Sequence, residues 1–202
     1  MTKIKLCGLT RPDDILAVNE LRPDYVGFVF YPKSKRFVTR ERAAELKQLL
    51  DPAIRAVGVF VDESPEAVAA LLEEGIIDVA QLHGHEDEAY RTALRQLTDK
   101  PVIQAFRVSR PEDCLTAEEC SAEYVLLDSG MGSGEAFDWS AVEGVNRPYF
   151  LAGGLHAGNV AAAIRALHPF AVDVSSGIET GGAKDYHKMK AFVNAVREED
   201  GQ

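Results

Sequence analysis

Eight short runs of apolar, largely β-branched residues divide this 202-residue chain at intervals of about 25 residues. Several runs are apolar throughout, such as residues 57–61, which is typical of parallel strands covered on both faces. The predicted strands are residues 3–6, 25–30, 56–61, 79–82, 102–106, 124–127, 149–152 and 171–174.

Amphipathic stretches lie between these runs and predict helices, because their apolar residues recur at three- and four-residue spacing. Pro12 stands two residues after Thr10 and Pro65 directly after Ser64, so we expect both hydroxyl side chains to cap helix starts. The predicted helices include residues 42–50, 66–74, 88–97, 160–167 and 186–197, with a weak one of about a single turn at 140–145.

Strand–helix alternation repeated eight times predicts an α/β fold with a parallel sheet. Eight strands also close a barrel, and 202 residues lies at the small end of the range for that fold. An open, doubly wound sheet is the alternative, but Cys7-Gly8-Leu9-Thr10 follows the first strand in place of a Gly-x-Gly-x-x-Gly loop. We therefore predict a single (βα)8 TIM barrel, parallel and eight-stranded, over residues 1–202.

The formal net charge of −10 disfavours nucleic acids and anionic membrane surfaces as partners. No apolar run approaches the roughly 18 residues of a membrane span, and the charged N-terminal segment lacks a signal-peptide core. Three cysteines without a Cys-x-x-Cys pair argue against a disulfide framework. These features predict a soluble cytoplasmic protein, and they leave both monomer and homodimer open.

Polar residues stand at the C-terminal ends of the predicted strands, where barrels of this kind carry their active sites. Each has a plain structural explanation too: a strand-end thiol is often inert, an Asp after a strand often forms a turn, and a basic loop is often merely solvated. His83 and His85 lack a nearby third ligand, so we predict no metal site. The candidate residues are Cys7, Arg36, Gln81, His83, Asp128 and Asp173.

Two loops rich in small residues follow the seventh and eighth predicted strands, where such barrels often bind phosphate. Glycines let the backbone approach an anion, and backbone N–H groups bind a dianion without requiring net positive charge. The candidate phosphate-binding residues are Gly153, Gly154, Ser175, Ser176 and Gly177.

Seven segments, in order along nearly the whole chain, resemble the phosphoribosylanthranilate isomerase family of tryptophan biosynthesis; they are residues 5–10, 27–36, 57–61, 81–84, 137–139, 152–155 and 172–179. The resemblance implies an Amadori rearrangement of N-(5-phosphoribosyl)anthranilate to the open-chain 1-deoxyribulose 5-phosphate product. It matches Cys7 to the general base, Asp128 to the general acid and Arg36 to the residue that holds the anthranilate carboxylate. Gln81, His83 and Asp173 match other positions that line the substrate pocket.

The implied chemistry suits these residue types. Ring opening requires a proton on the furanose oxygen, so Asp128 must be kept partly protonated by desolvation or by neighbouring negative charge. The resulting iminium acidifies the C2 proton, which a Cys7 thiolate can remove. Lys5 shares a strand face with Cys7, so its ammonium either favours the thiolate or pairs with an acid inside the barrel. No cofactor is required, because the substrate's own amine is the electron sink.

One segment departs from the family pattern, since Glu135 stands where the family often has lysine. We expect altered loop dynamics or phosphate electrostatics there rather than lost chemistry. Two other functions stay open: another phosphate-binding barrel enzyme, such as an aldolase or a synthase of indole-glycerol phosphate, and a non-catalytic phosphosugar-binding barrel. The first would call for a strand-end lysine, and Lys5 lies too deep. The second would need neither the acid nor the base.

Overall fold

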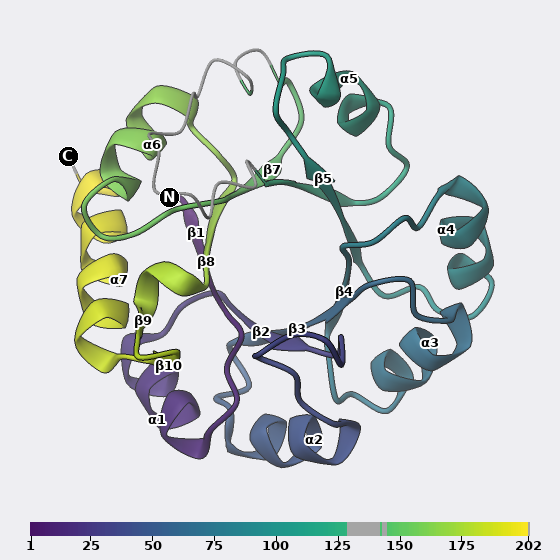
Figure 1. Ribbon diagram of the computed structural model, residues 1–202, viewed down its shortest axis with the longest axis horizontal. Coiled ribbons are helices and arrows are strands. Elements are labelled where there is room, and N and C mark those ends of the chain that lie inside the picture. Colours follow the sequence, from purple (N-terminus) through teal and green to yellow (C-terminus); the bar gives the residue numbers. More distant parts are fainter. Residues whose placement is uncertain (129–141, 143–144, 202) are drawn as a thin grey trace.

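The computed structural model describes residues 1–128, 142 and 145–201. Within this part of the chain, eight parallel strands pair in sequence order, and β1 pairs with β8 to close a barrel (Figure 1). They are β1 (Lys3–Cys7), β2 (Tyr25–Val29), β3 (Arg55–Phe60), β4 (Val79–Leu82), β5 (Val102–Arg107), β6 (Tyr124–Asp128), β7 (Tyr149–Ala152) and β8 (Ala171–Val174). The predicted TIM barrel is confirmed, and no end of a strand differs from its prediction by more than one residue.

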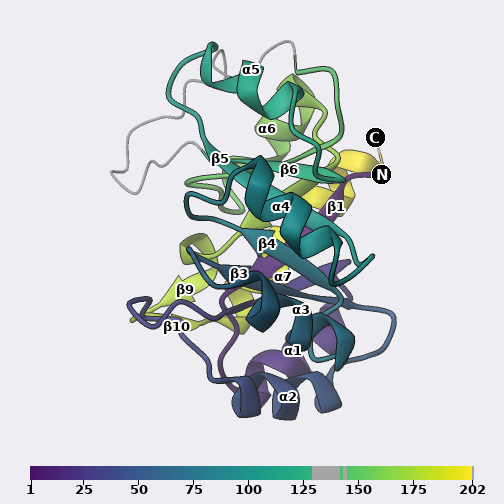
Figure 2. The same cartoon turned by 90° about the vertical axis from the view of Figure 1, so that its right-hand side faces the viewer.

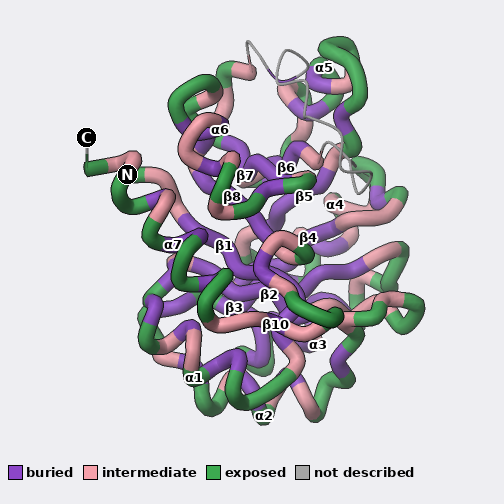
Figure 3. The backbone as a smooth tube through the Cα atoms, turned by 60° about the vertical axis from the view of Figure 1, so that its left-hand side comes forward, coloured by how far each residue is buried: buried purple, intermediate pink, exposed green. Residues whose placement is uncertain are grey.

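Helices surround the barrel and cover the outward faces of the strands (Figures 1 and 3). They are α1 (Pro12–Leu21), α2 (Arg40–Leu49), α3 (Pro65–Glu73), α4 (Glu88–Arg95), α5 (Asp113–Glu118), α6 (Val160–Leu167) and α7 (Tyr186–Asp200). The weak helix predicted at residues 140–145 falls largely outside the described residues.

The two predicted helix caps have different outcomes. Ser64 caps α3 and accepts a hydrogen bond from the backbone N–H of Ala67 at 3.3 Å, as predicted. The prediction for Thr10 is wrong, because Arg11 is the N-cap of α1. The Asp14 carboxylate instead accepts from the N–H groups of Thr10 and Arg11, each at 3.0 Å. A carboxylate in the first turn satisfies two free donors and complements the helix dipole, which a single hydroxyl cannot match.

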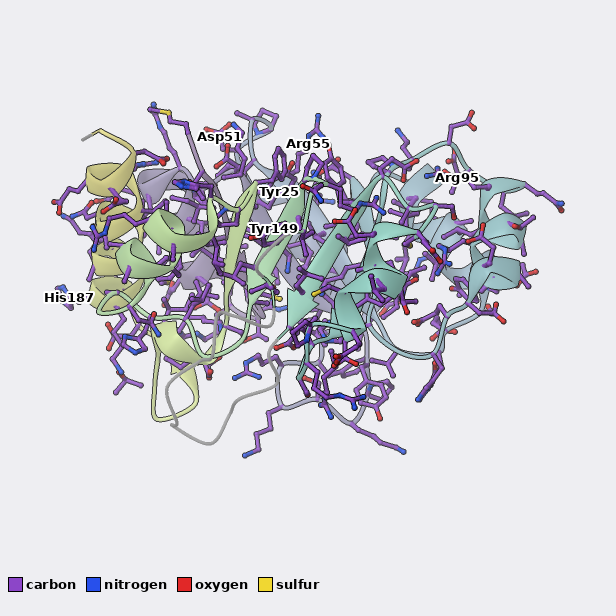
Figure 4. All side chains as sticks on the ribbon, turned by 90° about the horizontal axis from the view of Figure 1, so that it is seen from above. Tyr25, Asp51, Arg55, Arg95, Tyr149 and His187 are labelled. Carbon is purple, nitrogen blue, oxygen red and sulfur yellow. The ribbon has the colours of Figure 1, made fainter. Side chains whose placement is uncertain are left out.

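Aromatic rings close the N-terminal end of the barrel interior. Phe150 is fully buried and packs edge-to-face on Tyr25, Tyr124 and Phe170, with ring centroids 5.4, 5.8 and 5.7 Å away. Figure 4 shows Tyr25 among the central strands, while Arg95 and His187 project from the periphery. Because this end is filled, the polar residues of the strands are left to gather at the opposite mouth.

A small hairpin marks that mouth. After β8, a 3-10 turn at Ser176–Ile178 leads into β9 (Glu179–Thr180) and β10 (Ala183–Lys184), which pair antiparallel. The chain termini lie on the opposite side of the barrel (Figure 2), where the N–H of Thr2 donates to the Asp200 carboxylate at 2.6 Å. None of the helices in the described residues has the length and apolar character needed to cross a bilayer.

Replacing Phe150 with Ala should lower the free energy of unfolding by about 3–5 kcal/mol, because the lost ring leaves a cavity inside the barrel. Urea unfolding followed by circular dichroism measures this change. Leu115→Ala is the control: Leu115 is 66% exposed on α5, and its truncation should cost less than about 0.5 kcal/mol. Equal, small losses in both variants would contradict a structural role for the aromatic cluster.

Candidate active site

A cavity of about 360 Å³ opens at the C-terminal ends of the strands. Side chains along each strand point alternately into and out of the barrel. The last inward-pointing side chain of a strand, or the loop directly after the strand, therefore lines this cavity. The predicted residues that line it are Cys7, Arg36, Gln81, His83, Asp128, Gly153, Gly154, Asp173, Ser175 and Ser176. Thus the fold brings to one cavity residues drawn from both ends of the chain.

Gly177 does not line this cavity and has a different structural task. A Cβ at this position would lie 2.0 Å from the carbonyl oxygen of Leu155, which no side chain could tolerate. The missing side chain therefore lets the loop after β8 pack directly on the loop after β7. Through this contact Gly177 holds the two candidate phosphate-binding loops side by side.

Lys5 connects the barrel interior to the thiol of Cys7. Its fully buried ammonium donates to Oδ1 of Asp173 at 3.0 Å, and it also interacts electrostatically with Cys7. Burial raises the pKa of the Cys7 thiol above its ordinary value; Lys5 opposes this rise and the Asp173 carboxylate adds to it. Burial alone would lower the pKa of Lys5, but Asp173 and Cys7 outweigh it, so that pKa is raised and the ammonium stays charged.

Arg36 is held by Glu179, a residue that we did not single out from the sequence. Nε of Arg36 donates to Oε1 of Glu179 at 2.6 Å, and Nη2 donates to Oε2 at 2.8 Å. Lys184, whose side chain is 2% exposed, donates to the same Oε1 at 2.6 Å and to the Ser175 carbonyl at 2.9 Å. Two cations thus share one carboxylate, which leaves this cluster with one net positive charge beside the cavity.

The three groups of this cluster shift one another's pKa. Burial alone would raise the pKa of Glu179, but the hydrogen bonds from Arg36 and Lys184 outweigh it and keep that pKa below its ordinary value. Burial lowers the pKa of Lys184, and Glu179 counteracts part of that change. The hydrogen bond to Glu179 raises the pKa of Arg36. The carboxylate is therefore ionised throughout the neutral range and fixes the guanidinium in place.

Gln81, His83 and Asp128 form a chain of polar contacts across the cavity. Nε2 of Gln81 lies 2.9 Å from Nδ1 of His83, and Nε2 of His83 lies 3.4 Å from Oδ2 of Asp128. A neutral imidazole can carry its proton on either nitrogen. Because the amide nitrogen of Gln81 is a donor, Nδ1 of His83 accepts from it, and the proton of a neutral ring lies on Nε2, facing Asp128. His85 faces elsewhere: it is almost fully exposed and its Nδ1 lies 3.0 Å from Oδ2 of Asp62.

Arg107 lines the cavity, and we did not single it out from the sequence. It is the last residue of β5, in phase with the inward-facing Ile103 and Ala105, and its Cα is paired in register with that of Asp128. The predicted strand ended one residue earlier, so this position was not recognised as strand-end. Extending the two-residue alternation by one step would have found it. The segment around Glu135 and the match at residues 137–139 lie outside the described residues.

Known proteins resemble this chain over nearly its full length. The model of the N-(5'phosphoribosyl)anthranilate (PRA) isomerase family matches residues 4–195. N-(5'-phosphoribosyl)anthranilate isomerase of Endomicrobium trichonymphae is 42% identical, over 98% of this chain and 99% of the relative. The crystal structure of phosphoribosyl anthranilate isomerase from Thermotoga maritima gives a TM-score of 0.90 at 38% identity, over 98% of this chain and 100% of that one. A phosphoribosyl anthranilate isomerase in complex with reduced 1-(o-carboxyphenylamino)-1-deoxyribulose 5-phosphate gives 0.88 at 37% identity, with the same coverage.

Replacing Lys5 with Met should raise the pKa of the Cys7 thiol further, because the ammonium that opposes the rise is removed. The single variant leaves Asp173 nearly buried without its partner and should lose about 3–5 kcal/mol of stability. The double variant Lys5→Met with Asp173→Asn removes both charges, so it should fold better and still show a raised thiol pKa. Ultraviolet absorbance of the thiolate, titrated with Cys114 and Cys120 replaced by Ser, measures it. An unchanged pKa in both variants would reduce Lys5 to a structural ion pair.

Proposed function

The chain belongs to the N-(5'-phosphoribosyl)anthranilate isomerase family, and from this we propose how the residues of its cavity perform the reaction. The reaction is the Amadori rearrangement of N-(5-phosphoribosyl)anthranilate to 1-(2-carboxyphenylamino)-1-deoxyribulose 5-phosphate, a step of tryptophan biosynthesis. We take residues 1–202 as one catalytic domain. All of the proposed residues come from one barrel, so the chemistry needs no residue from a second subunit, whether the enzyme is a monomer or a homodimer.

The substrate lies across the cavity with its ribose between Cys7 and Asp128. Its phosphate binds the loops after β7 and β8, where Gly153, Gly154 and Ser176 line the cavity. The observation that supports this placement best is that Cys7 on β1 and Asp128 on β6 line the same cavity as these loops. Arg36 faces the remaining anionic group, the anthranilate carboxylate, and Glu179 holds its guanidinium for that contact.

Asp128 starts the reaction by donating a proton to the furanose ring oxygen, which breaks the C1–O bond and leaves an iminium. The iminium withdraws electrons from C2, and the Cys7 thiolate removes the C2 proton to give an enolamine. Tautomerisation of the enolamine gives the ketone product. His83 contacts the Asp128 carboxylate at 3.4 Å and can donate to it once its proton has left. The substrate's amine stores the electron pair, so the scheme requires no cofactor.

Cys7→Ser and Asp128→Asn should each lower kcat by at least about 100-fold, because each removes a group that transfers a proton. The fluorescence of phosphoribosylanthranilate differs from that of its product, so turnover can be followed directly. Cys120→Ser is the control, since Cys120 does not line the cavity, and it should keep wild-type activity.

The same assay separates the alternative functions. Saturable binding of the substrate by the wild-type chain without turnover would favour a non-catalytic barrel. Consumption of a sugar phosphate only by cleavage or ring closure would favour an aldolase or a synthase. Full activity of either active-site variant would contradict the proposed acid and base.

Glu179→Gln should raise the KM for phosphoribosylanthranilate about fivefold and change kcat by less than about twofold, because Arg36 loses its charged bidentate partner and its fixed orientation. Steady-state kinetics measures both constants. Glu74→Gln is the matched control, because Glu74 pairs with Arg40 on the outer surface, and it should change neither constant. A fall in kcat at constant KM would show that Glu179 acts on the chemical step instead.

A further inference from the structure

Two arginines, Arg36 and Arg107, line the cavity, and only Arg36 is paired with a carboxylate of the described residues. Two donors of Arg36 are taken by Glu179, at 2.6 and 2.8 Å. Arg107 has no hydrogen bond or ion pair with any described residue, and its residue is exposed at the mouth. As far as the described residues are concerned, Arg107 therefore keeps all of its guanidinium donors and its full charge available for a ligand.

Other cations in or beside the cavity are paired with carboxylates of the described part of the chain. Lys5 is paired with Asp173, and Arg36 and Lys184 share Glu179. The whole chain carries a net charge of −10, which repels an anion that approaches from solvent. Arg107, which has no partner among the described residues, adds a positive charge at the mouth that offsets this repulsion.

The position of Arg107 identifies the part of the ligand that it can reach. The proposed phosphate loops follow β7 and β8, while Arg36 lies in the loop after β2, and β1 separates β2 from β8 in the barrel. Arg107 lies at the end of β5. Strand β6, which carries Asp128, separates β5 from β7. A ligand anchored by its phosphate on the one wall extends its other end toward Arg107.

We propose that Arg107 is a substrate-binding residue that contacts the aromatic carboxylate of the substrate from the β5 side of the cavity. The proposal rests on the function proposed above, because it takes the phosphate as the group bound at β7 and β8. The planar guanidinium suits a carboxylate, since its parallel N–H groups match the two oxygens. Arg36 and Arg107 then approach the same carboxylate from two walls, which restrains the rotation of the anthranilate ring.

The test compares two non-reacting ligands on three proteins. The ligands are reduced 1-(o-carboxyphenylamino)-1-deoxyribulose 5-phosphate and its analogue without the carboxyl group, and calorimetry gives their Kd values. The proteins are wild type, Arg107→Gln and Arg110→Gln. Arg110 is the matched control, because it loses the same charge three residues further along, and its side chain is 74% exposed beside Asp113.

Arg107→Gln should weaken binding of the carboxylated ligand about fivefold to tenfold and that of the carboxyl-free ligand by less than about twofold. Arg110→Gln should change neither value. Equal weakening of both ligands by Arg107→Gln would overturn the proposal, because the residue would then act on the phosphate or through the general field. Unchanged binding of both would overturn it as well. If the wild-type chain binds neither ligand, the proposed function itself fails, and the inference falls with it.

Discussion

The pairing of β1 with β8 is the contact on which the rest of the structure depends. It closes the barrel and sets the register in which Lys5 lies opposite Asp173. Successive strand residues face opposite sides, so a slip of one residue at this seam would turn Asp173 away from Lys5. The buried ion pair between them, at 3.0 Å, therefore favours one register over its neighbours, since any other would leave a buried charge unpaired.

Closure of the barrel in this register also determines where polar side chains can lie in its interior. The aromatic cluster around Phe150 fills the opposite end, so an inward-facing polar residue is tolerated only in the upper layers. Lys5 occupies the layer just below the cavity and Cys7 the layer that lines it. Below the mouth, the buried ammonium of Lys5 has a charged partner in Asp173, whereas Arg107 at the mouth has none among the described residues.

The strands could be predicted closely because both of their faces are covered, and continuous apolar runs have clear ends. Three features could not be predicted, each for a physical reason. The cap of α1 depends on Asp14, whose carboxylate folds back to the backbone N–H groups of Thr10 and Arg11. Glu179 and Lys184 meet through a hairpin of two-residue strands, too short to show an alternation. The ion pair of Glu179 with Arg36 joins positions 143 residues apart, and no local sequence pattern predicts it.

In the proposed function, the phosphate and the carboxylate are bound by different kinds of group, which suits the negative charge of the chain. A phosphate bound by backbone N–H groups and small side chains needs no extra cation, so these loops add no charge that would require compensation elsewhere. Arginine is then reserved for the carboxylate, whose two oxygens need directional donors. Glu179 restrains the guanidinium of Arg36 by a bidentate ion pair, and Lys184 offsets the negative charge of the Glu179 carboxylate. Under the proposed roles, a ligand with only one of the two anionic groups satisfies half of this arrangement, so the cavity would select for the pair of charges rather than for either alone.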